Sequence, residues 1–298
     1  MLFLASFILK GPSQAALVAA SMAILGLAVP PAAWISAAAI VLVTLVNGPK
    51  SGLLTTAFSA FGAGIFAFLI FSSPQVALVF VLLAWLPAWI IATVLRQTVS
   101  LAYSLQVLTA ISLLAVVMVY AIAPNIGEHW REPLNIIVTQ LAEQSEDFTL
   151  AELQKTEDWV IKFLPGLFVS SVMFGTVLSL FLGRWWQAVF YNPGGFGEEF
   201  RNLNLGKISA LCASAIMLIA MFIGNVFALA MVAVVFALYG IQALSLLHAA
   251  IKIRQVNAAW LFAIYAIMFF VPHVLLLLIL VSFADPWLDI RQRISQQV

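Results

Sequence analysis

The chain has 298 residues and a formal net charge of +1, and 64% of its residues are hydrophobic while only 8% are charged. Soluble domains carry about 25% charged residues, so lipid rather than water must cover a chain this poor in charge. The small net charge excludes the strong basic field of a nucleic-acid-binding protein. The single cysteine, Cys212, excludes an internal disulfide or a cysteine metal cluster. The expected fold class is all-α, a polytopic transmembrane helical bundle that forms one membrane domain over residues 1–298.

A spanning helix needs about 20 apolar residues. By that measure the chain holds nine candidate spans, at 12–29, 32–47, 50–71, 75–95, 99–122, 160–182, 207–223, 226–250 and 258–283. Proline removes a backbone donor and obstructs the preceding turn, so we expect Pro87 to kink the fourth span and Pro272 to kink the ninth.

Lysine and arginine are enriched in cytoplasmic loops. On alternate connections, the basic residues are Lys10, Lys50, Arg96, Arg184, Arg201, Lys207, Lys252 and Arg254. This pattern predicts a bacterial inner-membrane protein with a cytoplasmic N-terminus, a cytoplasmic interfacial element at 184–206 and a periplasmic C-terminus. Arg291 and Arg293 in the C-terminal tail contradict it, and the tail would lie inside if two of the nine segments formed one span.

The segment 124–159 is acidic and is expected on the external side. Leu134, Ile137, Val138 and Leu141 share one helical face after Pro133, so the segment should be partly helical. Two interpretations stay open: a solvated acidic connector, or a lid that gates a ligand.

Small residues recur at four-residue spacing, which lets helix backbones approach closely in a membrane. The stripes are Ala15, Ala19 and Ala23 beside Ala16 and Ala20; Ser51, Thr55 and Ser59; and Ser171, Gly175, Ser179 and Gly183. Such stripes serve either packing within this chain or the docking of a partner membrane subunit, for which the first stripe fits best.

Polar residues inside a span are costly and are therefore candidates for ligand contact. They are His273 in the ninth segment, Tyr239 and Gln242 in the eighth, and Tyr103 and Gln106 in the fifth. His273 has a second interpretation, a neutral imidazole bonded to the carbonyl that Pro272 leaves free. No aspartate, glutamate, lysine or arginine lies well inside a predicted span, which argues against a proton-driven carrier with buried carboxylates. No enzyme signature, metal-ligand cluster or cofactor motif is present, so no catalytic activity or cofactor is expected.

The element 184–206 interrupts the apolar pattern. Trp185 and Trp186 suit the headgroup layer, and Asn192, Pro193, Gly194 and Gly195 form a turn sequence. Phe196 can then begin a short interfacial helix on which Glu198 and Arg201 share another face. This element either returns the chain to the membrane or offers a docking surface to a partner.

The run WWQAVFYNPGGFGEEFRNL, which starts at Trp185, resembles the signature stretch of the YybS-like family of predicted bacterial membrane proteins. The function of that family is unknown, and it is distantly similar to the substrate-binding subunits of energy-coupling factor transporters. Those subunits have six helices and bind vitamins or metal ions, and an Ala-x-x-x-Ala pattern in their first helix docks the coupling subunit. Ala15 with Ala19 and Ala16 with Ala20 fit that pattern, although this chain has more spans and a long acidic segment.

The resemblance implies a small-molecule-binding or transport subunit that works with other membrane subunits or an ATPase module. The alternative is a scaffold or envelope assembly factor that does not transport. A membrane-embedded enzyme is the least supported of the three.

Overall fold

The computed structural model describes residues 2–123, 125–144 and 150–296, and all regular structure within these residues is helical. The helices are α1 (Leu2–Ile8), α2 (Pro12–Gly26), α3 (Pro30–Asn47), α4 (Pro49–Phe71), α5 (Gln75–Phe80), the π-helix η1 (Val81–Trp85), α6 (Leu86–Thr98), α7 (Leu101–Ile122), the 3-10 helix η2 (Ile126–Trp130), α8 (Arg131–Gln144), α9 (Leu150–Tyr191), α10 (Gly195–Arg201), α11 (Gly206–Ile223), α12 (Val226–Ile253), α13 (Ala259–Phe270), α14 (His273–Leu288) and α15 (Ile290–Ser295). The predicted all-α class is confirmed.

Seven helical stretches in the described chain are long and apolar enough to cross a membrane, or eight if a bent pair at the C-terminus counts as one span. Two of the nine predicted spans therefore do not correspond to a single spanning helix in the structure. Segment 12–29 forms α2, which has only 15 residues. Segment 258–283 is broken into α13 and α14, whose axes bend by 113° at Pro272. The predicted kink there is a break between two helices, because α13 ends at Phe270 and a new helix starts at His273.

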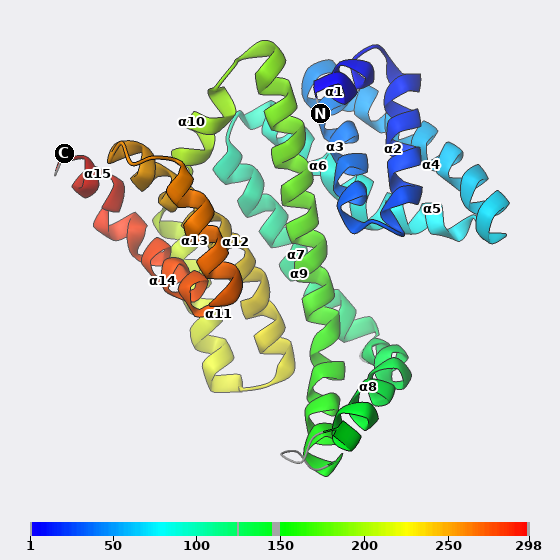
Figure 1. The fold of residues 1–298 in the computed structure, drawn as a ribbon, viewed down its shortest axis with the longest axis vertical. Coiled ribbons are helices and arrows are strands. Elements are labelled where there is room, and N and C mark those ends of the chain that lie inside the picture. Colours follow the sequence, from blue (N-terminus) through cyan, green and yellow to red (C-terminus); the bar gives the residue numbers. More distant parts are fainter. Residues whose placement is uncertain (1, 124, 145–149, 297–298) are drawn as a thin grey trace.

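Helix α9 runs through the centre of the molecule (Figure 1). It lies between α1–α6 on one side and α11–α15 on the other, and it packs on α3, α6, α7 and α12. Its 42 residues make it about 63 Å long, twice the hydrocarbon thickness of about 30 Å. Its N-terminal part therefore projects beyond the bundle, where it packs against η2 and α8. The described part of the acidic segment is thus helical, as predicted, while residues 124 and 145–149 lie outside the described chain.

Small residues set the spacing between α9 and the helices around it. A Cβ added to Gly183 of α9 would lie 2.5 Å from Cγ1 of Val41 in α3. A Cβ on Gly166 would lie 2.2 Å from the Cβ of Ala230 in α12. Only glycine therefore allows α9 to approach both neighbours this closely.

The alanine stripe of α2 is also covered within the chain. Ala15, Ala16, Ala19 and Ala20 are buried, and α2 packs on α3 and α4. The side-chain hydroxyl of Ser36 donates to the carbonyl of Ala19 at 2.6 Å and closes this contact. These alanines pack within the chain, and the docking of a partner subunit at this stripe stays a prediction.

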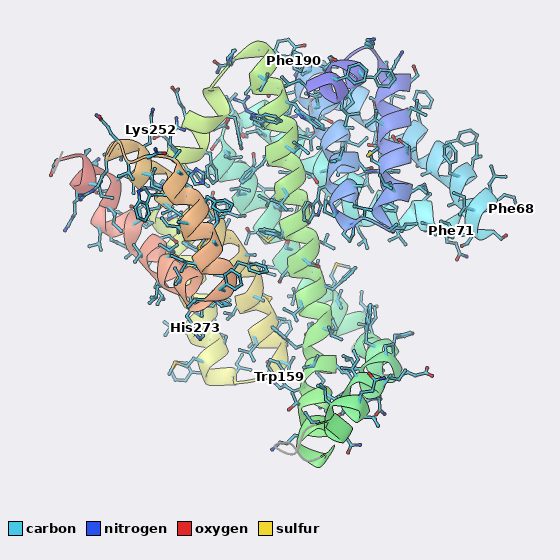
Figure 2. All side chains as sticks on the ribbon, viewed as in Figure 1. Phe68, Phe71, Trp159, Phe190, Lys252 and His273 are labelled. Carbon is cyan, nitrogen blue, oxygen red and sulfur yellow. The ribbon has the colours of Figure 1, made fainter. Side chains whose placement is uncertain are left out.

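Large apolar side chains cover the outside of the bundle (Figure 2). Phe222 of α11 is 86% exposed, Phe262 of α13 is 81% exposed, and Phe68 and Phe71 project from the end of α4. A water-soluble protein rarely exposes so large an apolar surface. Together with the seven spanning helices, this surface makes the chain a multi-pass membrane protein.

Candidate functional site

One end of the bundle gathers the basic residues, and we call it the basic end. There α9 joins α10, and Lys252 lies near the same end (Figure 2). The Arg96 guanidinium donates to the carbonyls of Leu45 and Val46 at the end of α3. Arg184 forms an ion pair with Glu199 at 2.9 Å, and burial raises the pKa of the Glu199 carboxyl. Arg96 and Arg184 at the basic end therefore both have partners within the protein.

The C-terminal helices are fastened to the basic end by a buried polar network. Asp285 of α14, which is 1% exposed, pairs with Arg291 of α15 at 2.5 Å. The same guanidinium donates to the carbonyl of Leu203 at 2.7 Å and to the hydroxyl of Ser245 at 3.1 Å. The C-terminal tail thus returns to the connection between α10 and α11. The described part of the tail therefore lies at the same end of the bundle as the element 184–206, and the side of the membrane on which the C-terminus lies stays a prediction.

Gln242, one of the predicted ligand-contacting residues, belongs to this network. Its amide oxygen accepts from the N–H of Leu205 at 3.0 Å, and its amide nitrogen donates to the carbonyl of Ser282 at 2.7 Å. Gln106 of α7 donates to the carbonyl of Leu205 at 2.6 Å. Both backbone polar groups of Leu205 are therefore held by glutamine side chains, and this fixes the point at which α11 begins.

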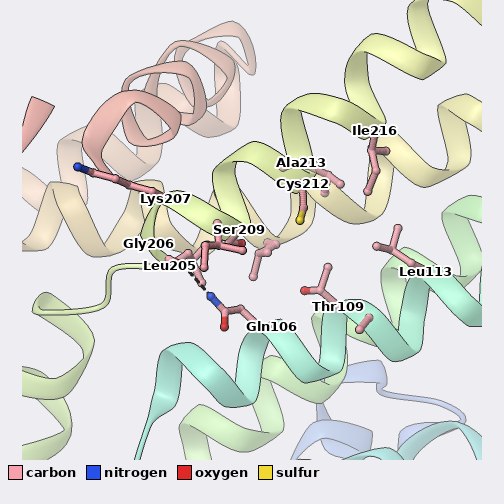
Figure 3. Close-up of a pocket in the computed structure, with 14 residues that line it drawn as sticks. Gln106, Thr109, Leu113, Leu205, Gly206, Lys207, Ser209, Cys212, Ala213 and Ile216 are labelled. Carbon is pink, nitrogen blue, oxygen red and sulfur yellow. Dashed lines mark hydrogen bonds between the residues drawn. The ribbon is translucent and has the colours of Figure 1, made fainter. Parts of the chain in front are cut away.

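A cavity of about 470 Å³ lies directly beyond that point, between α7 and α11, with α12 as its floor (Figure 3). We call it the α7–α11 groove. It exists because α11 packs on α12 and α14 and leaves a space toward α7. Its lining includes Gln106, Thr109 and Leu113 of α7, Lys207, Ser209, Cys212, Ala213 and Ile216 of α11, and Val235 and Leu238 of α12.

The groove is polar at one end and apolar along the rest of its length. Gln106, Lys207 and Ser209 lie at the basic end, whereas Leu113 and Ile216 line the part deeper in the bundle (Figure 3). Its mouth opens on the outer surface, since Ile208 beside it is 80% exposed. Such a site suits a molecule with a polar head and an apolar body that arrives from the bilayer.

The predicted ligand-contacting residues do not converge. Gln106 lines the groove, and Gln242 supports it from behind. Tyr103 is 52% exposed on the outer face of α7. His273 is exposed at the turn between α13 and α14 (Figure 2) and does not line the groove. Tyr239 is fully buried with its ring 4.5 Å from Phe283, and it does not line the groove.

Lys207, Ser209 and Cys212 line the groove but were not among the predicted site residues. The one available signal was a lysine and a serine on the first turn of a predicted span. That signal did not show which helix lies opposite. Among the described residues no group of three histidine, cysteine, aspartate or glutamate side chains could hold a metal ion.

The predicted turn in the element 184–206 is present. Gly194 has a φ of 88°, in the left-handed region that glycine tolerates, and α10 follows from Gly195. The rings of Phe196 and Phe200 pack on Phe181 of α9 at 5.5 and 5.4 Å, and Trp186 is fully buried. These contacts are those of an element that returns the chain to the bundle.

Some of this element stays accessible to a partner. Five residues that were predicted to dock a partner are exposed: Trp185, Asn192, Pro193, Gly194 and Glu198. Arg201, from the same set, is partly exposed. Docking at this face stays a prediction.

The fold and the groove define a helical multi-pass membrane protein with an amphipathic groove on its outer surface. Comparisons with protein-family models, with curated proteins and with solved structures found no match to this chain.

Proposed function

We propose that the protein is a membrane-embedded binding protein for an amphiphilic small molecule, which enters the α7–α11 groove sideways from the bilayer. The observation that carries this proposal is the cavity between two helices that do not pack together. A concave space of about 470 Å³ with an apolar lining and a few polar groups at one end is the usual form of a small-molecule site.

This proposal sharpens the expected small-molecule-binding subunit. A role in transport, alone or with an ATPase module, is compatible with it and so is the resemblance to the YybS-like family. Coupling through the alanine stripe of α2 is not favoured, because Ala15 and Ala19 are fully covered by the chain itself. A partner subunit would have to use another surface, such as the one that contains Trp185 and Glu198.

We also propose that the basic end faces the cytoplasm of a bacterial inner membrane and that both termini lie there, which requires the 15-residue helix α2 to cross the membrane together with the seven longer stretches. The positive-inside pattern supports this orientation. The contact of Arg291 with Leu203 supports the placement of the tail, because it returns the tail to the basic end. Arg291 and Arg293 then no longer contradict the pattern.

A matched pair of variants tests the groove. Ile216→Trp places a bulky ring in the groove, whereas Ile219→Trp adds the same ring at a position that is 56% exposed and outside the lining. Native mass spectrometry of each variant from mild detergent counts bound lipid-like molecules. We expect the wild type and Ile219→Trp to retain an amphiphile and Ile216→Trp to lose it. Equal retention by all three proteins contradicts the proposal.

A further inference from the structure

We infer that the protein has a second ligand site, which binds a quinone-type molecule: a flat ring with carbonyl oxygens and an apolar tail. The site is a cavity of about 390 Å³ between α9, α10, α12 and α13, and we call it the aromatic pocket. Its lining shares no residue with that of the α7–α11 groove, so the two sites can be tested separately.

Aromatic rings form the wall of the pocket where α10 packs on α9. The ring of Phe200 in α10 lies 5.4 Å from Phe181 of α9 and 6.2 Å from Phe196, measured between centroids. On its other side it meets the imidazole of His248 edge-on at 5.5 Å. Pairs of aromatic rings attract one another at about 4.5–7 Å beyond the effect of burial alone. A flat ring in the pocket therefore gains contacts that an acyl chain does not.

His248 of α12 and Tyr265 of α13 form a hydrogen-bonded pair in the lining. Nε2 of the imidazole and the hydroxyl oxygen are 2.7 Å apart. If the hydroxyl donates, a neutral imidazole carries its own proton on Nδ1, and if Nε2 donates, the hydroxyl hydrogen points elsewhere. With either tautomer the pair keeps one N–H or O–H that can donate to a ligand.

Arg201 of α10 is the third polar side chain in the lining. Its guanidinium lies against Gly197 one turn earlier, where an added Cβ would be 3.0 Å from Nη1. A guanidinium donates hydrogen bonds and accepts none. The residues that line the pocket include no carboxylate. The pocket therefore favours a ligand with acceptor oxygens, such as the two carbonyls of a quinone, over a cation.

The position of the pocket indicates that its ligand comes from the bilayer. Phe174 and Tyr265 line it and are 43% and 38% exposed, so it opens on the outer surface of the bundle. His248 lies one turn before Lys252, which is near the basic end (Figure 2). Phe174 and Ile241 line the part farther from that end. A ring held at His248 would thus lie close to the headgroup layer, with its tail in the hydrocarbon.

The test uses three probes with the same decyl tail: a decyl-substituted benzoquinone, decylbenzene and 4-decylbenzoate. Each is titrated into the full-length protein in a neutral detergent, and bound molecules are counted by native mass spectrometry. One neutral hydrogen bond changes affinity about three- to tenfold, so we expect the quinone to bind more tightly than decylbenzene by about that factor.

A double variant, His248→Phe with Tyr265→Phe, keeps both rings and removes the donors of the pair. It should lose most of the preference for the quinone and bind decylbenzene as the wild type does. Tyr191→Phe removes an exposed hydroxyl outside the lining and should change neither affinity. Ile216→Trp, which fills the α7–α11 groove, should leave quinone binding unchanged.

Four results would overturn the inference. Equal affinity of the wild type for the quinone and decylbenzene would show that the polar groups do not select the ring. Loss of both probes by the double variant would show that the pair supports the shape of the pocket instead. Loss of the quinone in Ile216→Trp would place it in the α7–α11 groove. Tighter binding of 4-decylbenzoate than of the quinone would assign the pocket to an aromatic anion.

Discussion

At the scale of single residues, function depends on where the chain places glycine and where it places paired polar groups. Gly183 and Gly166 let α9 lie against both halves of the bundle, because any Cβ there meets Val41 or Ala230. Gln106 and Gln242 hold the backbone of Leu205 from two sides. The glycine contacts join the two halves of the bundle. The glutamine contacts fix the point at which α11 begins, and the groove lies between α11 and α7.

The Gly183→Ala variant tests the close approach of α9 to α3. Its new Cβ would lie 2.5 and 2.7 Å from atoms of Val41, and overpacking of this kind costs about 1–3 kcal/mol. We expect a lower midpoint of thermal unfolding in detergent. Gly62→Ala is the control, since the nearest atom to its Cβ is 3.5 Å away, an ordinary contact. An equal effect of both changes would show that the helices do not pack as described.

At the scale of elements, the helical hairpin formed by α13 and α14 decides the topology. The 12 residues of α13 span only about 18 Å, less than the hydrocarbon thickness of about 30 Å. We therefore expect the chain to turn at Pro272 before it has crossed the membrane. Helix α14 then leads back to Arg291, whose contacts with Leu203 and Ser245 fix the tail at the basic end.

The hairpin predicts the side of the C-terminus. Reporter fusions after Asn202 and after Val298 should report the same side of the membrane, which we expect to be the cytoplasm. A complete ninth span would place the two fusions on opposite sides. An alkaline phosphatase fusion active at Val298 and inactive at Asn202 would therefore show that α13 and α14 cross the membrane.

At the scale of the whole molecule, the sequence predicted the helices better than their arrangement. All nine apolar segments are helical, and the turn at Gly194 follows from glycine's tolerance of a positive φ. The break at Pro272 could not be told from a kink, because the contacts of Arg291 with Asp285, Leu203 and Ser245 that fix the end of α14 join residues that include distant parts of the sequence.

The groove could not be predicted for a similar reason. A space between helices depends on which helices fail to touch, and hydropathy carries no such information. The polar residues Tyr103 and Gln106 look equivalent on one helical face, but the structure turns Tyr103 outward and Gln106 toward Leu205. In the sequence, Lys207 indicates only the topology. Its place beside the groove follows from the position of α7 opposite α11.

The central claim is that an amphiphile occupies the α7–α11 groove, and photo-crosslinking tests it most directly. A phosphatidylglycerol with a diazirine on its acyl chain is irradiated with the full-length protein in membranes, and the modified peptides are identified by mass spectrometry. The account predicts that modification concentrates on the groove-lining stretches between Gln106 and Leu113 and between Lys207 and Ile216, and that Ile216→Trp abolishes it there. Modification spread over outward residues such as Met221 and Phe222, without enrichment in the groove, would contradict it.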